Sequence, residues 1–127
     1  MNRKKIGDLT STEWQLIRIV WDNEPATARM IHDEILKERK TTYSVTSITL
    51  DRMVDKGFLK REKFGPVWVF TSQVAEGKMK KKAIEDFIHT VLGDTIAPIF
   101  IHAAKNKKFV DEYNTFKKMI EDIDDEE

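Results

Sequence analysis

The side chains that could catalyse a reaction or hold a metal are scattered along this 127-residue sequence rather than grouped in a motif. The three histidines, His32, His89 and His102, do not have the spacing of metal ligands. There is no cysteine, which excludes disulfides, thiolate metal sites and cysteine nucleophiles. No Ser/His/Asp set, pair of carboxylates or phosphate-binding loop stands out. The sequence therefore predicts neither an enzymatic reaction nor a cofactor.

The composition is that of a folded protein with a modest asymmetry of charge. Hydrophobic residues make up 40% of the chain, which is enough for a packed core. The formal net charge is +0 at pH 7, which argues against a protein that binds every polyanion. Residues 1–73 carry 13 Lys and Arg against 10 Asp and Glu, whereas residues 74–127 carry 9 against 12. This distribution permits an N-terminal half that faces nucleic acid, but does not require one.

Neither a membrane span nor a secretory signal is predicted. The longest apolar stretches, such as residues 96–104, are too short and too interrupted to cross a bilayer. The basic residues Arg3, Lys4 and Lys5 are not followed by an apolar stretch, as they would be in a signal peptide. We therefore expect a cytoplasmic protein without a membrane partner.

The elements that must position any binding site begin with a clearly marked helix. Thr10 and Glu13 have the spacing of a capping box, and Leu9 and Trp14 that of a hydrophobic staple. Apolar residues then recur at helical intervals up to Trp21, before the sequence Asp-Asn-Glu-Pro at 22–25 ends the pattern. Three tryptophans, Trp14, Trp21 and Trp68, are expected in the core or at an interface.

Two further helices are predicted before residue 57. The first is capped by Thr27 and runs to about residue 39, and the second spans residues 44–56. Gly57 follows where helices often end in a left-handed residue. Ser44 and Ser47 are candidates to cap the second of these helices. Its inner face is predicted from the apolar spacing to contain Thr46, Leu50, Met53 and Val54.

Two strand-like runs, at residues 58–62 and 67–71, flank a turn around residues 63–66. They indicate a β-hairpin, and because Gly65-Pro66 is not a common tight-turn pair we expect a loop of several residues. Three helices followed by a hairpin are the layout of a winged helix-turn-helix. The predicted fold class is thus mainly α with a small β-hairpin, with a winged-helix domain at 1–73.

Three amphipathic helices are predicted in the remainder, which we expect to form a helical dimerisation domain at 74–127. They begin near residues 75, 95 and 110, and short helices of this kind cannot bury their apolar faces alone. A second copy of the chain is the simplest cover. The expected interface residues are Phe87, Val91, Ile96, Ile99, Phe100, Tyr113, Phe116, Ile120 and Ile123.

Taken together, several blocks of the sequence resemble the penicillinase-repressor family, which includes β-lactamase, methicillin-resistance and copper-transport repressors. The resemblance covers roughly residues 8–120. Residues 9–14 with Val20-Trp21 are similar to the family's opening helix, and residues 25–29 to the entry of its second helix. Tyr43-Ser44 and residues 50–59 are similar to its recognition helix and following strand, and residues 70–72 to the end of its wing.

The resemblance implies a homodimeric repressor whose N-terminal winged helices bind a palindromic operator in double-stranded DNA. Its recognition helix would enter the major groove with its first turn foremost. The residues that would face bases are Ser44, Val45, Ser47 and Ile48, with Arg52 one turn further along. The residues suited to phosphate contacts are Thr27, Arg29, Thr41, Thr42 and Tyr43, with Lys60, Arg61 and Lys63 in the wing.

The sequence departs from the family on the base-facing turn, where members often have Lys, Thr or Arg and this chain has Val45 and Ile48. Apolar side chains can contact thymine methyl groups but offer no hydrogen bonds to bases. The operator sequence therefore does not follow from the resemblance. An alternative function, as a winged-helix module that binds protein instead of DNA, is suggested by these two residues and the zero net charge.

A second departure concerns regulation. The β-lactamase and methicillin-resistance repressors are cleaved at an Asn-Phe bond, and the matching positions here are His102-Ala103. The copper-responsive members have a cysteine-rich tail, which this chain lacks. The sequence thus indicates neither the inducing signal nor an upstream sensor or protease.

Overall fold

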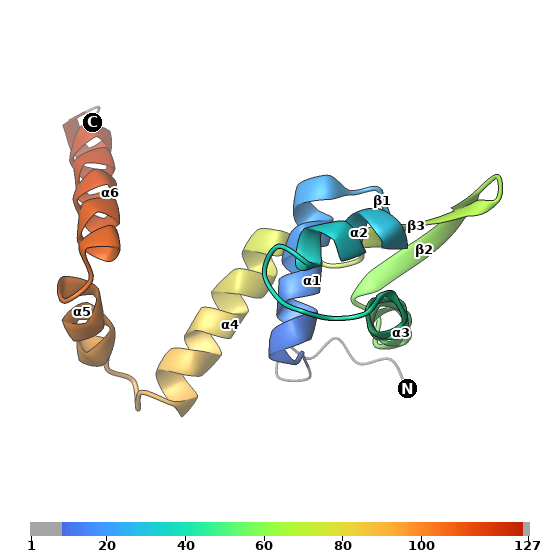
Figure 1. Ribbon diagram of the computed structural model, residues 1–127. Helices are drawn as coiled ribbons and strands as arrows, with labels where there is room; N and C mark the ends of the chain where they lie inside the picture. Colours follow the sequence, from blue (N-terminus) through green and yellow to red (C-terminus); the bar gives the residue numbers. More distant parts are fainter. Residues whose placement is uncertain (1–8, 126–127) are drawn as a thin grey trace. The chain divides into compact units, whose positions relative to one another are not determined.

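The computed structural model describes residues 9–125, and the side chains of residues 9–123. It is mainly helical, with a small antiparallel sheet (Figure 1). The elements are α1 (Ser11–Asn23), β1 (Ala26–Thr27), α2 (Ala28–Ile35), α3 (Tyr43–Asp55), β2 (Leu59–Phe64), β3 (Val67–Ser72), α4 (Glu76–Thr90), α5 (Ala97–Ala104) and α6 (Lys107–Asp125). This confirms the predicted fold class.

The capping box at the start of α1 is confirmed. The backbone N–H of Glu13 donates to the Thr10 hydroxyl (3.2 Å), and the N–H of Thr10 donates to the Glu13 carboxylate (2.9 Å). Leu9 is buried, and Trp14 packs against the same core, as the staple requires. Two donors that a helix cannot satisfy internally are thereby bonded, which defines where α1 begins.

Helix α2 is shorter than expected, and α3 begins one residue earlier. Thr27 caps α2 as predicted, by accepting the N–H of Met30 (3.1 Å), but the helix ends at Ile35 instead of near residue 39. Leu36 follows it with 47% of its surface exposed, so no buried side chain extends the helix. The cap of α3 is Thr42, whose hydroxyl accepts the N–H of Val45 (3.2 Å), rather than a serine.

The end of α3 is a Schellman motif. Gly57 has a φ of +88°, as predicted for the residue after the helix. The N–H of Phe58 donates to the carbonyl of Met53, and that of Gly57 donates to Val54, both at 3.0 Å. Phe58 is then buried, so this turn leads directly from α3 into the first strand of the hairpin.

The hairpin of β2 and β3 has a tighter turn than the sequence suggested. Phe64 pairs with Val67, which leaves only Gly65 and Pro66 in the turn. Gly65 has a φ of +60°, and a glycine at the first turn position is what type II′ hairpins require. The short strand β1, which the sequence did not indicate, pairs with β3 and gives the strand order β1-β3-β2.

A single hydrophobic core holds these elements together. Side chains of α1, α2 and α3 pack with residues at the base of the hairpin, including Phe58, Leu59 and Phe70. Trp21 lies at its edge and donates from Nε1 to the hydroxyl of Ser72 (2.9 Å), which fixes the end of β3 to α1. The hairpin extends beyond this core as a wing (Figure 1).

The chain divides into two compact units, residues 1–83 and 84–127. The division falls within α4, whose first turns belong to the N-terminal unit because Met79 is buried in its core. The domain boundary expected after residue 73 stays a prediction. In the second unit α5 and α6 pack against each other, with Phe100 and Tyr113 in edge-to-face contact at 6.5 Å. No helix among the described residues is long and apolar enough to span a membrane.

Candidate nucleic-acid interface

Helix α3 separates cleanly into a buried and an outward face. Thr46, Leu50 and Met53 are buried, as predicted, and Val54 packs against the core. Because successive residues of an α-helix are rotated by about 100°, the opposite face consists of residues 44, 48, 51, 52 and 55. All five are exposed, and Ile48 lies near the middle of this face. Five of the predicted contact residues therefore share one outward surface of α3 or its edges, namely Ser44, Val45, Ser47, Ile48 and Arg52.

A chain of aromatic and polar contacts joins the start of α2 to the start of α3. The guanidinium of Arg29 lies 4.3 Å from the centre of the Tyr43 ring, within the range of a cation–π contact. The ring of Tyr43 meets that of His32 edge to face at 5.6 Å. The buried His32 shares a hydrogen bond with the hydroxyl of Thr46 (2.9 Å between Nδ1 and Oγ1). Arg29 is thus held beside the first turn of α3.

Sequence analysis did not assign a role to His32, because a single histidine, here between Ile31 and Asp33, carries no motif. Its side chain bonds across 14 positions to Thr46, and only the packing of α2 against α3 brings the two together. Among the described residues, no group of three or more His, Asp or Glu is placed to hold a metal ion.

The wing carries its predicted cations on both faces. Side chains alternate along strands, so Arg61 and Lys63 share a face with the buried Leu59 and look toward the helices. Lys60 is on the other face, where its Nζ lies 2.7 Å from Glu62. The three wing residues predicted to contact phosphate therefore do not form one cluster.

Trp68 contacts two cations on the inner face of the wing. It pairs across the sheet with Lys63, whose Nζ lies 5.6 Å from the indole centre, and the guanidinium of Arg61 lies 5.0 Å from it. Trp68 is 47% exposed and does not join the core, so of the two positions expected for it, core or interface, the interface stays a prediction. Its ring instead supports two cations at a point where the wing extends beyond the helices.

An ion pair connects the wing to α3. The guanidinium of Arg61 lies 2.8 Å from the carboxylate of Asp51, one of the exposed residues of α3. Both side chains remain accessible to water, with 41% and 50% of their surfaces exposed. An exposed pair of this kind is weak enough to be exchanged for another anion.

Between α3, the start of α2 and the wing lies a groove of ≈ 400 Å³. Arg29 and Arg61 line it together with the Thr27 and Ser47 hydroxyls, and Asp51 contributes the one carboxylate among its lining residues. Its full lining consists of Thr27, Ala28, Arg29, Tyr43, Ser47, Asp51, Arg61, Pro66, Val67, Trp68 and Phe70. Guanidinium groups and hydroxyls are the donors that bind phosphate. Of the predicted phosphate contacts, Thr41, Thr42, Lys60 and Lys63 lie outside this lining.

A partly buried ion pair joins the C-terminal end of α3 to the start of α1. Both carboxylate oxygens of Glu13, which is fully buried, lie 3.0 Å from Nζ of Lys56, the C-terminal cap residue of α3. Burial by itself raises the pKa of Glu13. The hydrogen bonds from Thr10 and Lys56, together with the charge of Lys56, lower this pKa by more than burial raises it. The pKa of Glu13 therefore lies below its usual value. The sequence predicted the capping role of Glu13, but it did not predict that Glu13 pairs with Lys56, 43 positions away.

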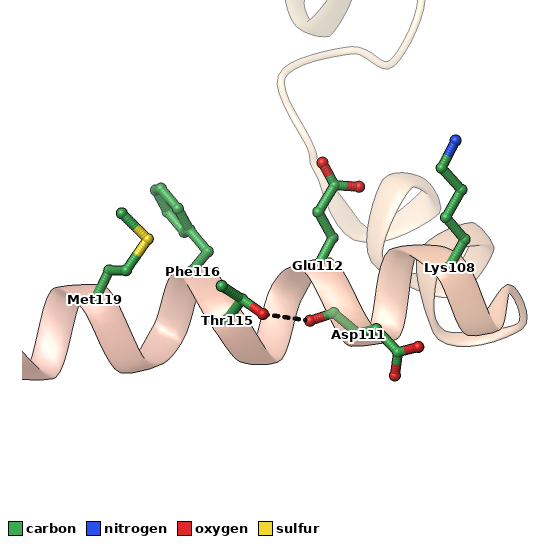
Figure 2. A pocket seen from close by; sticks show the side chains of 6 residues that line it. All are labelled: Lys108, Asp111, Glu112, Thr115, Phe116 and Met119. Carbon is green, nitrogen blue, oxygen red and sulfur yellow. Dashed lines mark hydrogen bonds between the residues drawn. The ribbon is translucent and has the colours of Figure 1, made fainter.

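The second unit presents a mostly uncovered apolar surface. All nine predicted interface residues are exposed, from Ile99 at 42% to Val91 at 64%. None of the described side chains of α5 and α6 is buried. Figure 2 shows Lys108, Glu112, Phe116 and Met119 projecting from the same side of α6, so a charged end passes into an apolar strip. Between α5 and α6 an apolar hollow of ≈ 600 Å³ remains, lined by Ile99, Phe100 and Phe109 among others.

Comparisons with known proteins agree with this architecture. A family model described as penicillinase repressor matches residues 9–122. The chain is 30% identical over 87 residues to the methicillin resistance regulatory protein MecI of Mammaliicoccus sciuri, covering 68% of this chain and 71% of that protein. It is 23% identical over 101 residues to a penicillinase repressor of Staphylococcus aureus, covering 80% of each. The solution structure of the DNA binding domain of the repressor BlaI matches 60% of this chain and 90% of its own, with a TM-score of 0.52 and 24% identity.

Proposed function

This chain belongs to the penicillinase repressor family, and on that premise we propose that it is a transcriptional repressor that binds double-stranded operator DNA as a homodimer. The observation that carries the proposal is the outward face of α3, which is exposed and lies beside a groove lined by Arg29 and Arg61. A protruding helix with cations beside it suits the major groove, where the helix meets base edges and the cations meet phosphates.

In this function the residues divide by role. Ser44, Val45, Ser47, Ile48 and Arg52 face the bases. Thr27, Arg29 and Tyr43, with Thr41 and Thr42 before α3, contact the phosphates on one side, and Lys60, Arg61 and Lys63 of the wing contact those on the other. The Thr27 and Thr42 hydroxyls accept backbone N–H groups of their own helices and still have a hydrogen to donate. The contacts to phosphate supply affinity without sequence information.

The dimer is supported by the exposed apolar residues of α4, α5 and α6. A patch this extensive is rare on a monomer and is typical of an interface. In α6, Tyr113, Phe116, Ile120 and Ile123 recur at intervals of three and four, which aligns them on one side of the helix. Two copies related by a two-fold axis would cover these strips reciprocally and present two α3 helices to two inverted half-sites. The operator is therefore proposed to be palindromic, and the protein to act in the cytoplasm.

Titration of a fluorescent random-sequence duplex at low salt tests whether the chain binds DNA at all. We expect binding that weakens steeply as salt is added, since counterions are released when cations meet phosphates. Complete absence of binding by folded protein would reject the proposal. It would favour the second candidate, a protein-binding winged helix, for which the exposed Val45 and Ile48 are the supporting observation.

A further inference from the structure

Two apolar side chains occupy the part of α3 where a hydrogen-bonding code would be expected. Val45 is 50% exposed and Ile48 is 58% exposed, and neither packs against the core. They are three residues apart and therefore lie on adjacent turns of the same side of the helix. Covering a water-exposed β-branched side chain with an apolar group lowers the free energy of the system.

Cations lie further along α3 from this apolar pair and in the groove beside it. Arg52 is one turn beyond Ile48 and two turns beyond Val45 on the same edge of α3, and its guanidinium is in no ion pair with the described side chains of residues 9–123. Toward the other edge, past Ser47 and Asp51, are Arg29 and Arg61 in the groove. The apolar pair thus has one guanidinium further along the same side of α3 and two more in the adjoining groove, with the carboxylate of Asp51 between the pair and the groove.

We propose that Val45 and Ile48 select the operator by contacting the 5-methyl groups of thymines in the major groove. The thymine methyl is the apolar group that this groove displays, and phosphate-lined walls rise on both sides of it. An exposed apolar pair with guanidinium groups further along the helix and in the adjoining groove suits methyl groups that lie close to phosphates. The inference rests on the proposed function and deepens it, because it assigns a base preference to two residues that cannot hydrogen-bond to a base.

The discriminating probe is deoxyuridine, which pairs as thymine does and lacks only the methyl group. The full chain is first used to select its best duplex from a random-sequence pool, and each thymine is then replaced singly by deoxyuridine. We expect one or two positions in each half-site at which loss of the methyl weakens binding about fourfold, the effect of one buried methyl group. Replacement of the other thymines should leave the dissociation constant unchanged.

Two variants then assign the methyls to side chains. Val45→Ala and Ile48→Ala should each bind the parent duplex more weakly and become insensitive to deoxyuridine at one of those positions. Leu36→Ala, which shortens an equally exposed apolar side chain at the end of α2, should retain the wild-type sensitivity. Because all three residues are exposed, circular dichroism is expected to show unchanged folding.

The outcomes separate the two proposals. A selected duplex that tolerates deoxyuridine at every position, or variants that keep the wild-type sensitivity, would overturn the methyl contacts while leaving the repressor function intact. The deoxyuridine scan of the wild-type chain decides this even if a variant fails to fold. If folded protein selects no duplex, both the proposed function and the inference are rejected, and Val45 and Ile48 are assigned to a protein partner.

Discussion

Both carboxylate oxygens of Glu13 lie 3.0 Å from Nζ of Lys56, so the N-terminal cap of α1 and the C-terminal cap of α3 are bonded to the same side chain. Glu13 is completely buried, and its remaining hydrogen bond comes from the N–H of Thr10. The proposed recognition helix is therefore held at its far end by a charge that water does not reach.

Replacement of Glu13 by glutamine should destabilise the protein by about 2 kcal/mol at pH 7, because it removes the buried carboxylate charge that pairs with the ammonium of Lys56. Urea denaturation followed by tryptophan fluorescence measures this difference. Glu34→Gln, which removes an exposed carboxylate paired with Lys37, is the matched control and should change stability by less than about 0.5 kcal/mol.

The same pair predicts a dependence on pH. Since the pKa of Glu13 is lower in the folded state than in the unfolded chain, its contribution is complete above the usual glutamate value and is lost as the pH falls through the folded value. The stability difference between wild type and Glu13→Gln should therefore shrink on acidification. A difference that stays constant from neutral pH to pH 3 would contradict the role given to this pair.

Cations on the proposed DNA surface should set the salt dependence of binding. Arg52→Ala combined with Lys63→Ala should weaken binding and reduce the slope of log K against log salt by about 1 to 2, since each phosphate contact contributes about 0.9. Both side chains are exposed, so helicity measured by circular dichroism should not change. Unchanged affinity and slope would mean that DNA, if bound, lies against another surface.

Removal of the negative charge of Asp51 should strengthen DNA binding, whereas removal of Arg52 and Lys63 should weaken it. Its carboxylate pairs with Arg61 in the free protein and would have to give way to a phosphate. Asp51→Asn should therefore strengthen binding to a duplex about two- to fivefold at low salt, the range of an exposed ion pair. Glu34→Gln removes an equal charge near the C-terminal end of α2 and should have little effect. Weaker binding by Asp51→Asn would show that the carboxylate itself contacts DNA.

Apolar residues of α6 should hold the dimer together. Phe116→Glu with Ile120→Glu would put two charges into the apolar strip, and sedimentation velocity should then report a monomer with unchanged helix content. Lys118→Glu alters the charge on the opposite side of α6, because residue 118 is rotated by about 160° from residues 116 and 120, and should remain dimeric. A dimer that survives the double substitution would place the interface elsewhere.

Features that depend on neighbouring residues were predictable from the sequence. Thr10 with Glu13 and the left-handed Gly57 act within one or two turns, so the boundaries that they define could be read from residue type alone. The buried face of α3 followed likewise from apolar spacing. The hairpin turn was misjudged because the positive φ of Gly65 permits a two-residue connection, which Gly-Pro does not usually form.

Contacts between distant segments were not predictable. Glu13 and Lys56 are 43 positions apart, and Arg61 and Asp51 belong to different elements whose distance follows only from packing. For Trp68 the sequence left a core and an interface position open, because apolar spacing does not reveal that a strand extends beyond the core. The candidate site could thus be located from the sequence, whereas the partners that orient Arg29 and Arg61 required the structure.

The central claim, that a homodimer reads an inverted repeat with its α3 helices, is tested most directly by selecting bound duplexes from a random-sequence pool at near-physiological salt. The protein should first be shown to be folded and dimeric. We predict recovery of an inverted repeat whose half-sites are about one helical turn of DNA apart. Recovery of nothing above background, or of sequences without two-fold symmetry, would contradict the claim.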